Sequence, residues 1–598
     1  KNRNEQFHSD HHFIKLSFIG EDQNKLGIGV KCKVYIGDRS IFYENYPTRG
    51  YLSSVSAQLT IGLGNIERID SLQVIWPNGK AQTLQNPTLN SSIIVDIKNA
   101  FEEKLNVNPY VIADQEVDFI PNFKHTELDS QEFLREPLAP YMTSHLGPRI
   151  SVIDINRDGL DDVFIGNGKK QSACLYLQQN DGTFVLDKNN DLESISTTEN
   201  NNQEFFDIDN DGDLDLLIAN GGGEFVSGEN LQPSLFVNDD GYLKLENNRL
   251  PKIETNISAI ALNDFDLDGD IDIFLGGSSV SQKFGETPES FLLINENGYF
   301  KVLTSEQVRG LSYPGLVRDA VWTDLNKDGW DDLLIVGHWM PLKIFLNNRG
   351  ILKEHTSDFL AQTNGLYNVI EPIDFDGDGD TDFILGNWGM NSRFQASVEA
   401  PMKLYINDFD KNGTQEPIIT YFSDGQETVF ANKDEITKQI PSLNKRFLSY
   451  SSFAKAKFED LFKKELIRSA EVKKVFNLAS ILIENKGDLN FEMFKLPKFA
   501  QISPIHAVLI QDLDRDGKVD MFVAGNDFQL NTQLGRLDAS TGQVFTANKS
   551  GNFEVNSKLT KKMTVSGAIR DIKSIQIGKE NYFVISRNNQ SLYWIKEK

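Results

Sequence analysis

Short apolar runs recur in pairs along most of the chain, separated by turns rich in Asp, Asn and Gly. Runs that follow these turns include DVFIGN, DLLIAN, DIFLGG and DLLIVG, and runs that precede them include RISVID, AIALND and HAVLIQD. Their length, β-branched content and closing Gly or Asn are typical of β-strands. The pattern predicts a series of antiparallel hairpins with an acidic loop at each turn.

A second hairpin is predicted after several of the first ones. Apolar runs on both sides of a polar turn occur in CLYLQQNDGTFVL, SLFVNDDGYLKL, FLLINENGYFKV and KIFLNNRGILKE. Two hairpins give four strands per unit. The acidic loops that start at Asp154, Asp207, Asp264, Asp324 and Asp374 are 53, 57, 60 and 50 residues apart. Four-stranded units at this spacing favour an all-β fold, a β-propeller whose ring removes exposed sheet edges.

The regular spacing ends after Asp374. The next loop begins at Asp408, only 34 residues later, and the last begins at Asp512, another 104 residues on. Between them, residues 432–475 carry Leu, Phe and Ile at steps of three and four among Lys and Glu. This amphipathic pattern predicts a helical insertion. The propeller then has eight blades, or seven if the stretches that begin at Asp374 and Asp408 share one.

The acidic loops suggest a metal site. Each of the seven has an oxygen-bearing side chain at positions 1, 3, 5 and 9 and Gly at position 6, the spacing with which calcium collects oxygen ligands. Position 7 is expected to contribute its backbone carbonyl. We therefore predict up to seven calcium ions. The side-chain ligands are Asp154, Asn156, Asp158 and Asp162; Asp207, Asp209, Asp211 and Asp215; Asp264, Asp266, Asp268 and Asp272; Asp324, Asn326, Asp328 and Asp332; Asp374, Asp376, Asp378 and Asp382; Asp408, Asp410, Asn412 and Glu416; Asp512, Asp514, Asp516 and Asp520. The position 7 residues are Leu160, Asp213, Asp270, Trp330, Asp380, Thr414 and Lys518.

An EF-hand is the competing interpretation of these loops. It needs a bidentate Glu at position 12 and a helix on each side. Position 12 is apolar in every loop here, which places it in a buried strand: Ile165, Ile218, Leu275, Ile335, Leu385, Ile419 and Val523. Solvated Asp-rich turns are the plainer alternative, but a fixed spacing in seven copies favours calcium.

The N-terminal part, residues 1–100, predicts a separate small β domain. Its segments KCKVYIG, QLTIGLG and SLQVIWPNG are apolar or alternating and are bounded by Gly, Pro and Asn, as in a small sandwich. Residues 101–124 are interpreted as a linker, and residues 125–598 as the propeller.

Composition limits the function. A net charge of −26 repels phosphate backbones, so nucleic acid is not an expected partner. No run of about 20 apolar residues is present, so no transmembrane segment is expected in the chain shown. The sequence has no GxSxG or HExxH motif and no Cys and His constellation, so no catalytic residues are predicted.

Two resemblances extend this interpretation. The acidic loops with their flanking strands resemble FG-GAP or VCBS repeats of integrin-α-like propellers, over residues 125–598. GIGVKCKVYIGDRS, RGYLSS and LTIGLGNIERIDSLQVIWPNGKAQTL, within residues 10–98, resemble the ASPIC and UnbV domain. The combination is similar to Bacteroidota outer-membrane surface proteins, many of them lipoproteins, and to cartilage acidic protein.

The resemblance implies an exported protein at the extracellular face of the outer membrane, with any signal or lipid anchor upstream of Lys1. The expected function is that of a non-enzymatic, calcium-stabilised binding or scaffold protein, a subunit of an outer-membrane complex or an adhesin-like module. Its expected partners are an outer-membrane barrel, surface lipoproteins or glycans. The alternative is a polysaccharide hydrolase or lyase, because propellers also host enzymes.

Overall fold

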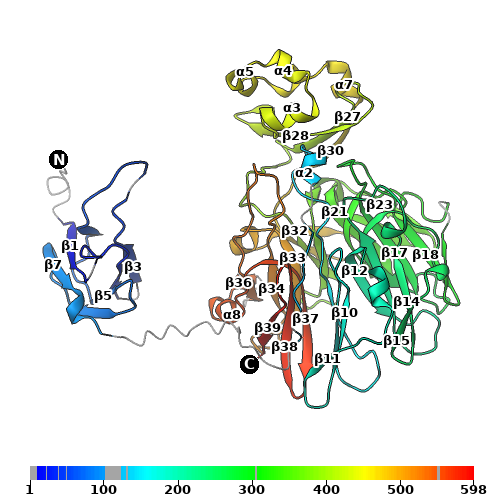
Figure 1. Ribbon diagram of the computed structural model, residues 1–598, viewed down its shortest axis with the longest axis horizontal. Coiled ribbons are helices and arrows are strands. Elements are labelled where there is room, and N and C mark those ends of the chain that lie inside the picture. The colour runs from blue at the N-terminus through cyan, green and yellow to red at the C-terminus, as the bar shows by residue number, and fades with distance from the viewer. Residues whose placement is uncertain are drawn as a thin grey trace. The chain divides into compact units, whose positions relative to one another are not determined.

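The computed structural model describes residues 10–21, 23–37, 39–48, 50–101, 121, 123–128, 132–303, 306–547 and 553–597 (Figure 1). These residues fall into two compact units, one within residues 1–112 and one within residues 113–598. Most of the predicted linker, residues 102–120 and 122, lies outside the described residues. Strands dominate both units, so the predicted all-β class is confirmed.

The first unit contains two sheets around one core. One sheet has the order β4 (Leu59–Gly64), β1 (His12–Ile19), β7 (Ser91–Asp96), with β1 and β7 parallel. The other has the order β3 (Arg39–Glu44), β2 (Lys31–Ile36), β5 (Ser71–Ile75), β6 (Ala81–Gln85). Buried Ile14, Ile61 and Val95 from the first sheet join Val34 and Val74 from the second in one hydrophobic cluster. The unit is therefore stabilised by apolar contact between its two sheets.

The second unit repeats an antiparallel sheet along the chain (Figure 1). We number the repeated sheets 1 to 7. Sheet 1 holds β8 (Ile150–Ile153), β9 (Asp162–Ile165), β10 (Cys174–Gln178) and β11 (Phe184–Leu186); sheet 2 holds β12 (Glu199–Phe206), β13 (Asp215–Gly221), β14 (Ser234–Asp239) and β15 (Tyr242–Leu245); sheet 3 holds β16 (Asn256–Asn263), β17 (Asp272–Ser279), β18 (Phe291–Glu296) and β19 (Tyr299–Val302).

The later sheets follow the same order with local changes. Sheet 4 holds β20 (Leu316–Thr323), β21 (Asp332–Met340), β22 (Lys343–Asn347) and β23 (Leu352–His355), and β24 (Gly365–Leu366) pairs with β21; sheet 5 holds β25 (Val369–Ile373), β26 (Asp382–Gly386), β31 (Ile481–Asn485) and β32 (Phe491–Lys495); sheet 6 holds β33 (Ile505–Gln511), β34 (Asp520–Gly525), β35 (Gln543–Ala547) and β36 (Phe553–Val555); sheet 7 holds β37 (Ala568–Ile577), β38 (Glu580–Asn588) and β39 (Tyr593–Lys596). The short helix α8 (Ser557–Lys562) follows β36.

Consecutive sheets contact one another through their first strands. The contacts run from β8 through β12, β16, β20, β25 and β33 to β37, and β37 also contacts β8. At that last contact the Ile150 backbone N–H donates to Asp571 Oδ2 at 3.0 Å. Ile150 and Val163 of sheet 1 share a buried cluster with Ile575 and Val584 of sheet 7. Sheets 1 and 7 are thus packed together although they lie at opposite ends of the unit's sequence.

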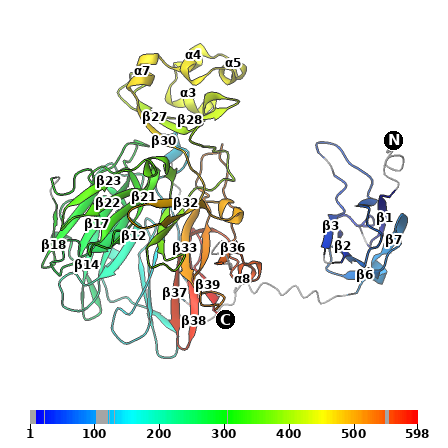
Figure 2. The same ribbon diagram turned by 180° about the vertical axis from the view of Figure 1, so that it is seen from behind.

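An inserted unit leaves sheet 5 between β26 and β31. Its sheet has the order β29 (Gln426–Val429), β28 (Glu416–Ser423), β27 (Met402–Asn407), β30 (Glu471–Val475). The helices after β29 are α3 (Lys433–Gln439), α4 (Leu443–Arg446), α5 (Tyr450–Ala454), α6 (Phe458–Leu461) and α7 (Lys464–Ser469). Figures 1 and 2 show these helices beyond β27 and β28, at the end of the second unit. The insertion is therefore a small sheet covered by helices.

The boundaries of the inserted unit differ from the prediction. The predicted helical segment 432–475 is helical only to Ser469, because residues 471–475 pair with β27 as β30. The helices begin where expected, since the Asn432 side chain accepts a hydrogen bond from the Glu435 backbone N–H and caps α3. The hairpin around Asp408 belongs to the inserted sheet, while β31 and β32 complete sheet 5, whose first hairpin holds the loop that begins at Asp374.

The inserted sheet packs against other elements on both faces. On one face Tyr405 and Ile418 contact Ile436 and Phe458 from the helices. On the other face Leu404 and Ile419 share a cluster with Tyr141, Trp339 and Trp388 from outside the insertion. A short helix, α2 (Glu132–Arg135), precedes sheet 1 in the sequence. Among the described residues, no helix is long and apolar enough to cross a membrane.

Candidate metal centre

All seven acidic loops lie at the turn between two antiparallel strands, as predicted. Position 9 is the first residue of the second strand in each hairpin: Asp162, Asp215, Asp272, Asp332, Asp382, Glu416 and Asp520. The apolar position 12 residues then lie in buried strands, which agrees with the argument against an EF-hand.

The loops turn through two residues with positive φ. Gly at position 6 has φ between 81° and 99° in the seven loops. Position 4 is also left-handed, with φ of 57° at Arg157, 60° at Asn210 and 59° at Leu267. The sequence prediction missed position 4. The available signal is that Asn210 and Gly377, two residue types that accept this conformation, occupy the position.

The position 1 carboxylate shapes the loop. Asp264 Oδ1 accepts from the Asp268 backbone N–H and its Oδ2 accepts from the Gly269 backbone N–H, both at 3.0 Å. The loops that start at Asp154, Asp324, Asp408 and Asp512 have the same pair of bonds. These bonds hold the loop closed around the acidic side chains.

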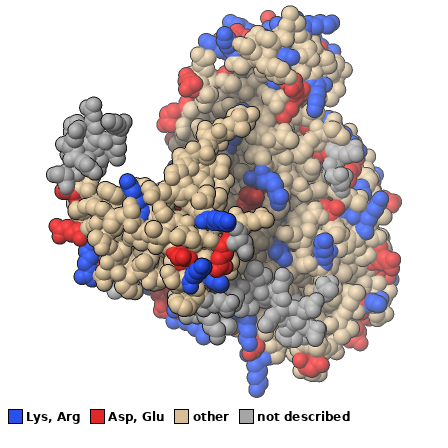
Figure 3. All heavy atoms as spheres, turned by 60° about the vertical axis from the view of Figure 1, so that its left-hand side comes forward, with Lys and Arg blue, Asp and Glu red and all other residues tan. Residues whose placement is uncertain are grey.

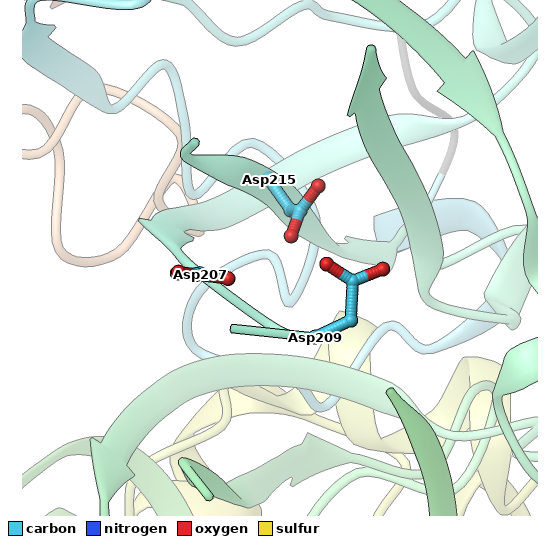
Figure 4. A group of neighbouring side chains, drawn as sticks. All are labelled: Asp207, Asp209 and Asp215. Carbon is cyan, nitrogen blue, oxygen red and sulfur yellow. The ribbon is translucent and has the colours of Figure 1, made fainter. Parts of the chain in front are cut away.

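Three acidic side chains converge in five of the loops. One oxygen from each of positions 1, 3 and 9 lies within 4.8 Å of the others in the following groups: Asp207, Asp209 and Asp215; Asp264, Asp266 and Asp272; Asp374, Asp376 and Asp382; Asp408, Asp410 and Glu416; Asp512, Asp514 and Asp520. Figure 4 shows the first group, with Asp209 and Asp215 directed toward each other. The other two loops carry Asn156 and Asn326 at position 3, whose amide oxygen is also a calcium ligand type. The structure therefore brings together the predicted side chains at positions 1, 3 and 9 in five of the seven loops.

Position 9 also has a structural role that the sequence did not indicate. Asp215 is fully buried; its Oδ2 accepts from the Ile208 N–H at 2.9 Å, and its Oδ1 accepts from the Asn238 N–H of β14 at 2.7 Å. The corresponding residues of sheets 1, 3, 4 and 5 make the same two bonds. Each thus ties the acidic loop to the third strand of its sheet.

Burial makes these carboxylates weaker acids when no cation is beside them. It raises the pKa of Asp162, Asp215 and Asp272 to about 7, although backbone N–H donors lower each pKa and neighbouring loop carboxylates raise it. Burial also raises the pKa of Glu416 to about 7. A bound cation stabilises the charged form and therefore opposes this effect.

Several loop oxygens have no partner within the described part of the chain. They are buried and accept no hydrogen bond: Asp207 Oδ1, Asp209 Oδ1, Asp266 Oδ1, Glu416 Oε1 and Asp520 Oδ1. A buried carboxylate oxygen without a donor is costly, and a cation satisfies it. The donor set is all oxygen, which suits a hard cation. The residues of these loops therefore fit a metal ion.

Positions 5 and 7 do not join the converging groups. The position 5 carboxylate accepts from the backbone N–H of position 7, as Asp268 does from Asp270 at 3.0 Å. The acidic side chains at position 7 contact the preceding loop instead: Asp213 lies 3.9 Å from Arg157, Asp270 accepts from Asn210, and Asp380 pairs with Lys327. Metal ligation by position 5 side chains and position 7 carbonyls stays a prediction.

Comparisons with protein families agree with the two resemblances. The ASPIC and UnbV family matches residues 20–101, and the FG-GAP-like repeat matches residues 154–218, 207–275 and 324–385. The chain thus carries an ASPIC and UnbV domain followed by FG-GAP-like repeats. A search of curated proteins finds no match.

Solved structures share only a distant likeness. A structure of BBS1N in complex with ARL6DN has a TM-score of 0.33 at 7% identity, covering 77% of this chain and 94% of that one. An auxiliary nutrient binding protein from Bacteroides ovatus has a TM-score of 0.25 at 10% identity, covering 67% and 79%. An ancestral GH74 enzyme has a TM-score of 0.27 at 8% identity, covering 75% and 65%. Likenesses at these TM-scores do not define a function for this chain.

Proposed function

We propose that this protein is a calcium-stabilised, non-enzymatic binding scaffold of the cell surface. Calcium is the proposed ion because the loops offer many oxygen ligands, whereas magnesium usually keeps several of its waters. The residues that would hold it are those at positions 1, 3, 5 and 9, with the position 7 carbonyl. The ion would neutralise the clustered charge and hold each loop closed.

We further propose that sheets 1 to 7 are the blades of one closed, seven-bladed propeller. The contact of β37 with β8, and the bond from Ile150 to Asp571, support this closure. The inserted sheet lies outside the order of first-strand contacts, so it does not count as a blade in this proposal.

The proposed location is the extracellular face of the outer membrane. Extracellular calcium at millimolar levels fills even sites of about 10⁻⁴ to 10⁻³ M affinity, whereas cytosolic calcium leaves such sites empty. Without a bound cation, the clustered carboxylates of these loops repel one another. This argument supports an exported protein and adds to what the domain resemblance implies.

The observation that carries the proposed binding role is the charge of residues 432–475, which form the helices α3 to α7 and the strand β30 of the inserted unit. Residues 432–475 contain eleven Lys and Arg against six Asp and Glu, a net charge of +5 in a chain whose net charge is −26. Leu448 and Tyr450 expose 86% and 67% of their surface there. Figure 3 shows Lys and Arg side chains gathered at that end of the second unit. We propose that this surface docks on an acidic, partly apolar face of an outer-membrane barrel or surface lipoprotein.

A charge-reversal experiment tests this role. Lys445, Lys455 and Lys464 are exposed on the insertion, and changing all three to Glu should abolish co-purification of outer-membrane proteins that the unaltered protein retains. Lys188, Lys353 and Lys562, exposed on other parts of the second unit, provide a matched triple Lys→Glu control that should retain them. Equal retention by both variants contradicts the docking surface. Turnover of a polysaccharide by the purified protein contradicts the non-enzymatic role.

A further inference from the structure

A cavity lies where the first strands of the seven sheets meet. In five of these strands a β-bulge displaces one residue from the pairing with the second strand: Asn201, Ser258, Arg318, His506 and Arg570. All five line one cavity of about 60 Å³, together with Arg149 and Asn368, which directly precede β8 and β25. Each sheet thus contributes a residue on or directly before its first strand, and in five sheets a bulge directs that side chain to the common space.

The charges around this cavity are unbalanced. Three guanidinium groups line it, from Arg149, Arg318 and Arg570, and Asp527 is the single carboxylate among the described residues that do so. Asp527 Oδ1 is already shared, since it lies 3.3 Å from Arg570 Nη2 and 2.9 Å from His506 Nε2. Burial lowers the pKa of His338 and of His506, so neither imidazole carries a charge that needs a partner at neutral pH. The net charge of the cavity is therefore positive.

Arg149 and Arg570 are held by the protein itself. Arg149 Nη1 donates to the Arg570 carbonyl oxygen at 3.0 Å, and Arg570 Nη1 donates to the Asn526 carbonyl oxygen at 3.0 Å. Two neutral side chains of the lining are also bound to the backbone: Ser258 Oγ donates to the Val317 carbonyl oxygen, and Asn368 Nδ2 donates to the Ile505 carbonyl oxygen. The guanidinium groups are the charged donors that the lining offers to a molecule in the cavity.

Arg318 differs from the other two arginines. It is 9% exposed, its Nε has no hydrogen-bond partner, and no carboxylate in the described part of the chain lies within ion-pair distance of it. A buried guanidinium without an acceptor is strongly unfavourable, because its lost hydration is not replaced. Its planar fork of donors matches two oxygens of one ligand group.

We infer that this cavity binds a small oxyanion group, a carboxylate or a sulfate- or phosphate-like group, with Arg318 as the residue that contacts it. Arg149 and Arg570 add positive charge around the ligand. The cavity volume admits a small anion, or the anionic end of a longer molecule. This inference does not depend on the proposed docking surface or on calcium.

The test uses the full chain with calcium present. Melting temperature and calorimetric binding are measured with sodium sulfate, sodium acetate and sodium chloride at equal ionic strength, so that sulfate and acetate separate the two oxyanion classes. Saturable binding of sulfate or acetate is expected, with at least a tenfold loss of affinity in Arg318→Met. Arg309→Met, a change at an exposed arginine, should bind as the unaltered protein does. The inference is overturned if Arg318→Met binds sulfate or acetate as tightly as the unaltered protein does. It is also overturned if sulfate and acetate change the melting temperature of the unaltered protein no more than chloride does.

A second measurement covers the case in which Arg318→Met does not fold. Crystals of the unaltered protein soaked in selenate should show an anomalous peak beside the Arg318 guanidinium, and an empty cavity contradicts the proposal. The stability of Arg318→Met and of the unaltered protein is also compared without any oxyanion, which distinguishes a ligand-binding role of Arg318 from a structural one. Arg318→Met should then be at least as stable as the unaltered protein, because it removes an unpaired buried charge; a large loss of stability instead assigns Arg318 to the fold.

Discussion

The side-chain Nδ2 of Asn210 donates a hydrogen bond to Asp270 Oδ1 at 2.7 Å, which ties one acidic loop to the next. Asn210 is position 4 of its loop and Asp270 is position 7 of the following one. Arg157 and Asp213 repeat the relationship between sheets 1 and 2, and Lys327 and Asp380 repeat it between sheets 4 and 5. Neighbouring sheets are therefore linked at the acidic loops as well as through their cores.

Asn210→Gly should weaken this link without affecting metal binding. Gly keeps the positive φ of position 4, so the loop is preserved while the side-chain hydrogen bond is lost. The expected loss is about 0.5 to 1.5 kcal/mol of unfolding free energy, the usual contribution of one such bond. Asn297→Gly is the control, because Asn297 also has a positive φ but no side-chain bond to another loop is seen. Urea denaturation and calcium analysis measure the two effects; equal losses in both variants contradict the link.

Calcium removal should lower the melting temperature markedly. A ligand that binds only the folded state stabilises it by about 2.7 kcal/mol per independent site at a hundredfold excess over Kd. Thermal unfolding is compared in millimolar calcium, in chelator, and in chelator followed by excess calcium. Identical curves in calcium and chelator contradict the proposed metal.

Asp266→Ala should remove one calcium ion and leave the others. Asp266 is position 3 of its loop and has an unpartnered buried oxygen. Repeated units interact mainly with their neighbours, so a change in one loop should affect metal binding in that loop alone. Metal analysis should therefore show a decrease of about one ion per chain. Asp239→Ala, at the exposed last residue of β14 and outside the loops, should not change the metal content. Loss of all bound calcium from Asp266→Ala contradicts independent sites.

Leu267→Asn should stabilise the protein. Leu267 is position 4 of its loop, with φ of 59° and 56% of its surface exposed, so it has backbone strain without full burial of its side chain. Asn accepts this conformation more readily, and a gain of about 1 kcal/mol is expected. Leu134→Asn, at an exposed helical residue of α2, is the control and should be neutral or destabilising. If chemical denaturation shows the same change in unfolding free energy for both variants, the assignment of backbone strain to Leu267 is wrong.

Stability should fall as the pH rises toward 8 because of Glu371. Burial raises the pKa of Glu371 to about 8 from its ordinary value of 4.5. Asp319 and Asp571 raise this pKa further, while Lys573 and Arg149 lower it. The folded state therefore holds a proton that the unfolded chain releases above its own pKa, so stability is fully present below about pH 4.5 and lost as the pH rises through about 8.

Glu371→Gln tests this dependence. The variant should be more stable than the unaltered protein at pH 8 and should show a flatter pH profile between pH 5 and 8. Saturating calcium keeps the loop carboxylates ionised during the measurement. Glu193→Gln, at an exposed residue, should leave the profile unchanged. A parallel profile for Glu371→Gln contradicts the assignment.

The hairpins and acidic loops were predictable because their signals are local. A strand, a loop and the next strand fit within about 20 residues, and turn residues mark both hairpins of a sheet. The convergence of Asp207, Asp209 and Asp215 follows from the spacing of one loop. The left-handed φ at Leu267 was missed because its side chain gives no sign of it.

Features that depend on distant parts of the chain were not predictable. Glu471–Val475 pairs with β27, but the sequence of this segment does not distinguish it from the helices before it, because it is short and rich in Lys. The bulge that places Arg318 in the central cavity appears only when two strands are paired. In the sequence, Arg318 cannot be distinguished from other polar residues of a strand. Its place in the cavity depends on the contacts between the first strands of the seven sheets.

The inserted unit also determines the order in which sheet 5 can be completed. Leu385 of β26 pairs with Ile481 of β31, which is 96 positions further along the chain. Within the insertion, Met402 pairs with Val475, so the two ends of the inserted unit lie side by side once it is folded. Only 17 positions then separate Leu385 from Met402 and six separate Val475 from Ile481, which reduces the loop that must be closed. During synthesis, early folding of the insertion would therefore speed completion of sheet 5, and slow folding of the insertion would delay it.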